Sequence, residues 1–142
     1  MVTDYRKPLP RPTVDTKEYW EGCKRHELLV QRCRDCGAYR FYPAGMCHRC
    51  QSVNSEWANV SGKGTIYSWI VVNRPVSPAW ADEVPYIAVI VELDEDAGVR
   101  IPGNLVDCAP NDVKAGMPVE VVFEDVTSEV TLPKWRPVSC SE

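Results

Sequence analysis

Four cysteines of this 142-residue chain are spaced as ligands for one metal ion. They form two C-x-x-C pairs, Cys33 with Cys36 and Cys47 with Cys50, and ten residues separate the pairs. A C-x-x-C turn brings two sulfur atoms onto one ion while its backbone N–H groups point at the sulfurs, and two such turns complete a tetrahedral set. The spacing predicts a zinc site, although iron in a rubredoxin-like site would use the same ligands.

The predicted metal is structural, because four protein ligands leave no coordination position for water or substrate. The loop between the pairs has few apolar residues and cannot fold alone, so the metal supplies its folding free energy. Gly37 gives the first turn a permissive backbone, whereas Gln51 follows the second. A zinc ion with four thiolates carries a charge of about −2. Four nearby arginines would offset it: Arg32, Arg34, Arg40 and Arg49.

The remaining cysteines favour a reduced environment. The chain has seven cysteines, and an odd number does not suit a disulfide framework. The first residues lack the apolar core of a secretion signal, and no apolar run approaches the roughly 18 residues that a membrane helix needs. We therefore expect a cytoplasmic protein.

Three segments must position the metal ligands. Residues 1–14 contain three prolines and predict an extended arm. Residues 15–52 predict a short helix followed by the zinc ribbon, and residues 53–142 predict a β-rich domain. Asp15 is a candidate helix cap, and Gly22 should keep the helix short because glycine lowers helix stability by about 1 kcal/mol relative to alanine.

The third segment consists of short runs of β-branched and aromatic residues, punctuated by Gly and Pro. The five runs are Trp57–Val60, Thr65–Val72, Tyr86–Leu93, Val99–Val106 and Val119–Val126. Val130–Leu132 could extend the last run or add a short edge. Five strands in so short a segment favour a five-stranded OB-fold barrel, with an open β-sandwich as the alternative. The predicted fold class is mainly β: an N-terminal helix and a rubredoxin-like zinc ribbon followed by this barrel.

No group of residues predicts a catalytic site. The two histidines, His26 and His48, are interpreted as surface or packing residues. Cys108 could serve a stand-alone esterase or transferase, but no histidine lies in its half of the chain to activate it. Carboxylates cluster at the end of the third run and are interpreted as a solvated turn, with an acid/base pair or a cation site as the alternative: Glu92, Asp94, Glu95 and Asp96.

The charge is unevenly distributed, which bears on the nature of the partners. Residues 1–50 carry a net charge of +4 and residues 51–142 carry −8. Single-stranded nucleic acid is the alternative ligand, since zinc ribbons and OB barrels both bind it and aromatic side chains could stack on bases. The acidic β half opposes this reading, because phosphate contacts need Lys or Arg. The candidate aromatics, which core packing would also explain, are Trp57, Tyr67, Trp69, Trp80, Tyr86 and Trp135.

A series of motifs resembles one known family over roughly residues 15–138. It begins with Tyr19-Trp20-Glu21-Gly22 and the segment from Leu28 through Cys36-Gly37. It continues with Tyr42-Pro43 before the second cysteine pair and Ser61-Gly62-Lys63-Gly64-Thr65. Later members are Pro85-Tyr86, Gly103-Asn104-Leu105-Val106, Gly116-Met117-Pro118 and Leu132-Pro133-Lys134-Trp135. The family comprises zinc-ribbon plus OB-fold proteins associated with acyl-CoA. Gln51 departs from its pattern, which has glycine after the fourth cysteine.

The resemblance implies a small non-catalytic subunit that pairs with a thiolase, a thiolase-like aldolase, a hydroxymethylglutaryl-CoA synthase-type enzyme or a hydratase acting on acyl-CoA. Such a subunit supports assembly and could help to hold CoA, and the small subunit of a benzylsuccinate-pathway thiolase is one member this chain resembles. Aromatic or steroid degradation is the implied setting. Candidate contacts with the partner or with CoA lie in the positive half: Tyr19, Trp20, Lys24, Arg25, Arg34, Arg40 and Arg49. Tyr19 and Trp20 could equally cover the barrel.

Overall fold

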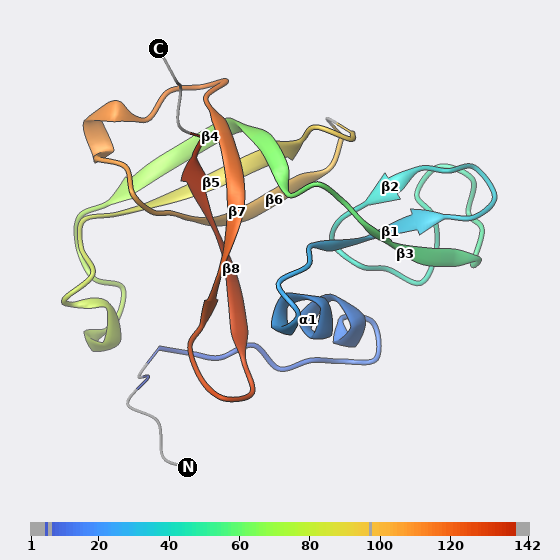
Figure 1. The fold of residues 1–142 in the computed structure, drawn as a ribbon, viewed down its shortest axis with the longest axis horizontal. Helices are drawn as coiled ribbons and strands as arrows, with labels where there is room; N and C mark the ends of the chain where they lie inside the picture. Colours follow the sequence, from blue (N-terminus) through green and yellow to red (C-terminus); the bar gives the residue numbers. More distant parts are fainter. Residues whose placement is uncertain (1–4, 6, 97, 139–142) are drawn as a thin grey trace.

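In the computed structural model, which describes residues 5, 7–96 and 98–138, a helix and a small sheet precede a closed barrel (Figure 1). The helix is α1 (Lys17–Lys24). The small sheet has the order β2-β1-β3 and contains β1 (Leu29–Cys33), β2 (Tyr39–Arg40) and β3 (Ser55–Asn59). The barrel has the order β4-β5-β6-β8-β7. Its strands are β4 (Lys63–Val72), β5 (Tyr86–Leu93), β6 (Arg100–Leu105), β7 (Pro118–Asp125) and β8 (Thr131–Pro137). Two 3₁₀ turns, η1 (Pro78–Trp80) and η2 (Pro110–Asp112), lie in the connections.

The barrel closes around side chains that alternate along each strand. In β5 the inward positions Ile87, Val89 and Val91 are buried, as period-2 geometry requires. β4 pairs with both β5 and β7, and β6 meets β8 in parallel at Leu105 opposite Trp135. Trp135 is only 1% exposed and lies in the core. The predicted fold class, a mainly β chain with an OB-fold barrel, is therefore confirmed.

Two of the predicted strand assignments are wrong in detail. The run Trp57–Val60 belongs to β3, which pairs with β1 in the ribbon sheet and not with the barrel. The fifth barrel strand is β8, which was expected only as an extension or an edge at Val130–Leu132. β8 contains two prolines and three charged or polar residues, so its sequence lacks a clear strand pattern. It is a strand because it pairs with β7 along its length.

The helix is short, as expected, but Asp15 does not cap it. Thr16 occupies the N-cap position, and the backbone N–H of Thr13 donates to its hydroxyl at 2.9 Å. Gly22 is buried against Leu29, whose Cγ would lie 2.7 Å from a β-carbon at this position. Glycine therefore allows the helix to approach β1 closely. Among the described residues no helix is long and apolar enough to cross a membrane.

One continuous core joins the helix and ribbon to the barrel. Tyr19 and Cys23 of α1 and Val30 of β1 belong to the same buried cluster as the barrel residues. Beyond the core, the ring of His26 stacks on Phe123 at 5.3 Å, which ties the end of the helix to β7. The ribbon is therefore held in a defined position relative to the barrel, at the opposite end of the long axis in Figure 1.

The described part of the predicted arm runs along the barrel without regular structure. Lys7 forms an ion pair with Glu83 at 3.1 Å, and its ammonium lies 4.7 Å from the ring centroid of Trp80. Pro10 and Pro12 line a pocket together with side chains of α1. Residues 1–4 and 6 of the arm, and Cys140 near the other end, lie outside the described residues.

Candidate metal centre

The four predicted ligands converge at one point in the ribbon. All four sulfur atoms lie within 4.8 Å of one another. Sγ of Cys33 is 3.5 Å from Sγ of Cys50, and Sγ of Cys36 is 3.6 Å from Sγ of Cys47. Zinc–sulfur bonds of about 2.3 Å in a tetrahedron require sulfur separations of about 3.8 Å, so the sulfur atoms are already close to zinc geometry. One cysteine of each pair is buried and the other is exposed.

The two C-x-x-C turns have the same backbone geometry despite their different sequences. The N–H of Gly37 donates to the carbonyl of Cys33 at 3.0 Å, and the N–H of Gln51 donates to the carbonyl of Cys47 at 3.0 Å. Both residues have positive φ, 79° for Gly37 and 64° for Gln51. Gln51 therefore occupies the left-handed conformation that glycine usually supplies, and the departure from the family pattern leaves the second turn intact.

Backbone N–H groups favour the thiolate form of the buried cysteines, which is the form that binds metal. The N–H of Cys36 lowers the pKa of Cys33. The N–H groups of Cys50 and Arg49 lower the pKa of Cys47 to about 6. A closed set of four soft sulfur donors suits zinc in a structural role, with all positions filled by protein.

A buried polar network, not expected from the sequence, positions the loop that leads to the second cysteine pair. The amide oxygen of Gln31 accepts hydrogen bonds from Nε of Arg40 and from the N–H of Ala44, both at 2.8 Å. Nη2 of Arg40 donates to the carbonyl of Ala44 at 2.8 Å. The available signal was a glutamine directly after the apolar run Leu28–Val30, where its side chain must be buried and hydrogen-bonded.

The arginines around the cysteines occupy different environments. Arg40 is only 6% exposed, so the expectation that it contacts a partner or CoA is corrected: its guanidinium bonds to Gln31 and Ala44 inside the ribbon. Arg34 is exposed and lies 3.8 Å from a carboxylate oxygen of Glu56. Arg49 is exposed, and no ion pair with its guanidinium occurs in the described part of the chain. Arg32 donates to the carbonyl of Gly37 at 3.2 Å.

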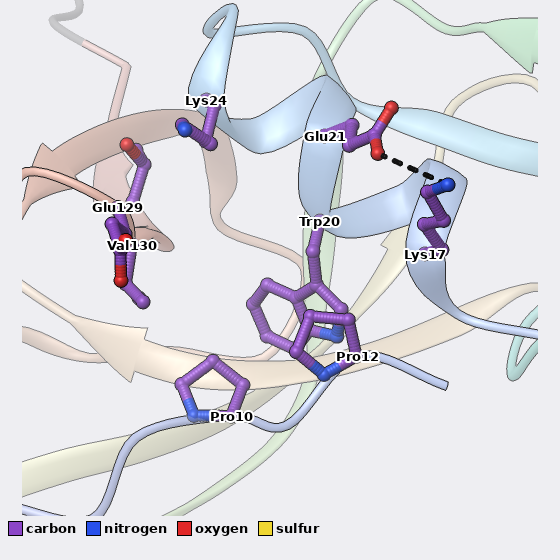
Figure 2. A pocket seen from close by; sticks show the side chains of 9 residues that line it. Pro10, Pro12, Lys17, Trp20, Glu21, Lys24, Glu129 and Val130 are labelled. Carbon is purple, nitrogen blue, oxygen red and sulfur yellow. Dashed lines mark ion pairs between the residues drawn. The ribbon is translucent and has the colours of Figure 1, made fainter. Parts of the chain in front are cut away.

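The candidate contacts on α1 divide into buried and accessible residues. Tyr19 is 5% exposed and packs edge-on against Trp20 at 5.0 Å, so it covers the core and is not an exposed anchor. Trp20 and Lys24 line a pocket of about 350 Å³ that the arm and the β7–β8 loop complete (Figure 2). Arg25 is exposed and forms an ion pair with Glu27 at 3.1 Å.

The groups considered for catalysis lie apart from one another. The Cys108 thiol donates to the carbonyl of Ala109 at 3.5 Å, and its burial raises its pKa, which disfavours a nucleophilic thiolate. His26 lies 3.1 Å from a carboxylate oxygen of Asp125, the last residue of β7. His48 is an exposed ribbon residue. Of the acidic residues, Glu92 pairs with Arg100 at 3.3 Å and Glu95 accepts from the N–H of Ser61 at 2.6 Å.

The aromatic residues considered for nucleic-acid stacking are scattered. Trp135 is buried, and Trp57 and Trp69 pack against the core. Tyr67, 49% exposed, lies on the barrel surface, but Arg100 covers it at 3.9 Å and is itself paired with Glu92. Trp80 packs against Tyr86 at 4.9 Å beneath Lys7, which is paired with Glu83. The cations over Tyr67 and Trp80 are thus each paired with a carboxylate, which disfavours contacts with phosphates.

Comparison with known proteins matches both parts of the chain to one family. Residues 20–54 match the family described as ChsH2, rubredoxin-like zinc ribbon domain. Residues 57–124 match the family described as ChsH2, C-terminal OB-fold domain. With the four converging cysteines, these matches identify the ribbon as a zinc ribbon and zinc as its structural metal.

Similar proteins align with most of this chain. A probable enoyl-CoA hydratase alpha subunit of Thermomonospora curvata is 38% identical over 90% of this chain, which spans only 40% of that longer protein. A DUF35 domain-containing scaffold protein of Methanocaldococcus jannaschii is 38% identical over 78% of this chain and 77% of its own length. A solved structure described as an Ltp2-ChsH2(DUF35) aldolase superposes with a TM-score of 0.81 at 36% identity, covering 90% of this chain and 98% of that one. The chain is therefore a member of the DUF35 family of ChsH2-type zinc-ribbon and OB-fold proteins.

Proposed function

We propose that this chain is a non-catalytic, zinc-binding accessory subunit of a cytoplasmic complex that acts on acyl-CoA thioesters. Its catalytic partner is a thiolase-fold enzyme, either a thiolase or an aldolase, in aromatic or steroid degradation. The observation that carries this proposal is the likeness, over 90% of the chain, to a chain in a structure named as an Ltp2-ChsH2(DUF35) aldolase. That name joins two components, and this chain resembles one of them.

The chemistry of the chain supports this division of labour. The four sulfur ligands use every coordination position of a tetrahedral zinc ion, so the metal stabilises the ribbon and does not activate water. Cys108 donates to the carbonyl of Ala109 and His26 contacts Asp125, so in the described part of the chain their hydrogen bonds are not those of a nucleophile and its base. The partner therefore supplies the catalytic groups, and this subunit supports assembly.

The pocket beside α1 is the proposed site for a bound CoA thioester. Trp20, Pro10 and Pro12 give the pocket its apolar part, and Lys24 of the same helix also lines it (Figure 2). Its volume of about 350 Å³ is within the range of small-molecule sites. Arg25 and Arg34 are accessible but would first have to leave their ion pairs with Glu27 and Glu56.

The test is recovery of the assembly from the native host. The tagged chain is purified gently, its companion proteins are identified by mass spectrometry, and the eluate is assayed with a panel of acyl-CoA thioesters for thiolysis, retro-aldol cleavage and hydration. We expect a thiolase-fold companion, and turnover that persists when Cys108 of this chain is replaced by Ala. Turnover by the isolated chain, or an eluate of RNA without an enzyme, would refute the proposal.

A further inference from the structure

The ribbon exposes apolar side chains next to the second cysteine pair. Tyr42 is 63% exposed and Met46 is 54% exposed. Together with His48 and Arg49 they form what we call the ribbon patch. A cavity of about 350 Å³ lies against this patch, and Gly98 of the β5–β6 turn completes its lining. Large apolar side chains that stay exposed side by side are typical of interaction sites.

The loop that carries the ribbon patch is held at several points. Arg40 and Gln31 both bond to Ala44 at 2.8 Å, in the middle of the loop. The N–H of Cys47 donates to the carbonyl of Ser52 at 2.8 Å, which closes the second turn. The ring of Tyr42 rests edge-on against Phe41 at 5.6 Å. The exposed side chains are therefore presented by an ordered backbone, which lowers the entropy lost on binding.

The ribbon side of the ribbon patch carries the positive charge that favours an acidic neighbour, while the β5–β6 turn at its other edge carries Asp96, which accepts from the N–H of Gly98 at 2.8 Å. Arg40 is buried beneath it, its two acceptors are neutral, and its Nη1 has no hydrogen-bond partner among the described residues. Arg49 is exposed and forms no ion pair with any residue that the structure describes. Residues 1–50 carry +4, and they remain positive after the two negative charges of a zinc tetrathiolate are included.

We propose that the ribbon patch is the docking surface for the catalytic subunit, and that it fits an apolar area of that subunit surrounded by carboxylates. Tyr42 and Met46 form the apolar centre, because aromatic residues and Met are enriched in interface cores. Arg49 supplies the charged rim. This inference rests on the proposed function for the existence of the partner, but it assigns the contact to residues outside the pocket beside α1.

The outer face of the barrel is the rival surface. Ile70 is 63% exposed and lies opposite Ala88 in the β4–β5 pair, in an apolar hollow that Ile90 and Pro102 extend. Among the residues that the structure describes, no charged side chain lines this hollow. It therefore offers nothing to match the charge of a partner, whereas the ribbon patch does. Ile70→Ser consequently serves as the matched control, since it removes an equally exposed apolar side chain.

Methionine labelling gives a direct test, because the chain has only three methionines. The zinc-loaded chain is labelled with [13C-methyl]methionine, Met46 is assigned with Met46→Leu, and the co-purified catalytic subunit is added. We expect the Met46 signal to shift or broaden, while that of Met117, which packs against the barrel core, stays in place. A complex that leaves the Met46 signal unchanged overturns the ribbon-patch assignment and leaves the accessory function standing. Failure to find any catalytic subunit overturns both.

Affinities with the same partner provide the second readout. The double variant Tyr42→Ser/Met46→Ser should bind about tenfold more weakly or worse, and Arg49→Glu should do likewise, with the loss reduced at high salt. Ile70→Ser should bind as the parent does. Each variant must retain one zinc ion per chain, which separates a lost interface from a lost fold. Unchanged binding in the first two variants with weaker binding in Ile70→Ser would place the interface on the barrel instead.

Discussion

Arg40 and Gln31 are joined inside the ribbon by a hydrogen bond of 2.8 Å from Nε to the amide oxygen. Both residues are almost fully buried, 6% and 7% exposed respectively. The same amide oxygen holds the N–H of Ala44, so a single side chain from β1 fixes both β2 and the loop that leads to Cys47. The geometry of the metal site thus depends on a neutral buried amide as well as on the cysteines.

Replacing Gln31 with Met should destabilise the ribbon by about 2 kcal/mol, because the change leaves Nε of the buried Arg40 and the N–H of Ala44 without their acceptor. Zinc should also leave faster when a chelator is added. Thermal unfolding of the zinc-loaded protein and the rate of zinc release measure the two effects. The control is Val53→Ala, at a position of the ribbon that is 71% exposed, for which a change within about 0.5 kcal/mol is expected. Equal stability and equal rates of zinc release in the two variants would contradict the role of the network.

Removing the metal should unfold the ribbon and leave the barrel folded. Cys47→Ser should reduce the zinc content from one ion per chain to nearly none, because three remaining ligands hold the ion far less tightly. Trp135 is buried in the barrel, so its near-UV signal should persist. Metal analysis and circular dichroism provide the measurements. Cys108→Ser, outside the ribbon, is the control and should retain zinc. Retention of zinc by Cys47→Ser, or iron in the parent protein, would disprove the assignment.

Gln51→Gly should stabilise the second cysteine turn. Gln51 has a φ of 64°, which costs an L-residue about 1 kcal/mol or more, whereas glycine adopts this conformation freely. Part of this gain is lost to the greater freedom of glycine in the unfolded chain, so we expect a net gain of up to about 1 kcal/mol. Gln51→Val should destabilise, because a β-branched residue tolerates positive φ poorly. The resistance of the bound zinc to a chelator should be highest in Gln51→Gly, intermediate in the parent and lowest in Gln51→Val. Any other order would contradict the strain at Gln51.

The contact between Asp125 and His26 predicts a specific loss of stability in acid. The hydroxyl of Thr131 and then the ring of His26 lower the pKa of Asp125 below its usual value of 3.8. A lowered pKa in the folded state means that the carboxylate stabilises the fold above the unfolded pKa, and that this contribution disappears as the pH falls through the folded value. Asp125→Asn should therefore flatten the decline in stability below about pH 4.

Unfolding midpoints of parent and variant between pH 3 and pH 6 measure this effect. Zinc release at low pH is common to both proteins and cancels in the comparison. Asp15→Asn, at an exposed position before α1, is the control and should follow the parent. An Asp125→Asn variant with the same acid profile as the parent would rule out the contribution of this carboxylate.

The sequence predicted those parts of the structure that local spacing determines. The four cysteines identified the metal site, since two C-x-x-C turns position their sulfurs by backbone geometry alone. The long runs at β4, β5 and β7 were found because one face of each is buried. Glycine and proline marked the boundaries of these strands with an accuracy of a few residues.

Features that depend on tertiary contacts were missed. β3 carries a strand pattern, but nothing local indicates whether it pairs with β1 or with the barrel. β8 contains Pro133 and Pro137, and only its place between β6 and β7 makes it a barrel strand. Arg40 looked like a surface cation because arginine is seldom buried, and its burial depends on Gln31 nine residues earlier in the chain. Its burial could not be derived from the sequence pattern.

Native mass spectrometry of the tagged chain, purified from its own host at low salt, tests the accessory role most directly. We predict an assembly whose mass is the sum of zinc-loaded copies of this chain and copies of a thiolase-fold enzyme in a fixed ratio. The chain released from this assembly in the gas phase should still carry one zinc ion. A zinc-loaded chain that appears alone, or bound to nucleic acid with no enzyme subunit, would contradict the proposal that it serves as an accessory subunit.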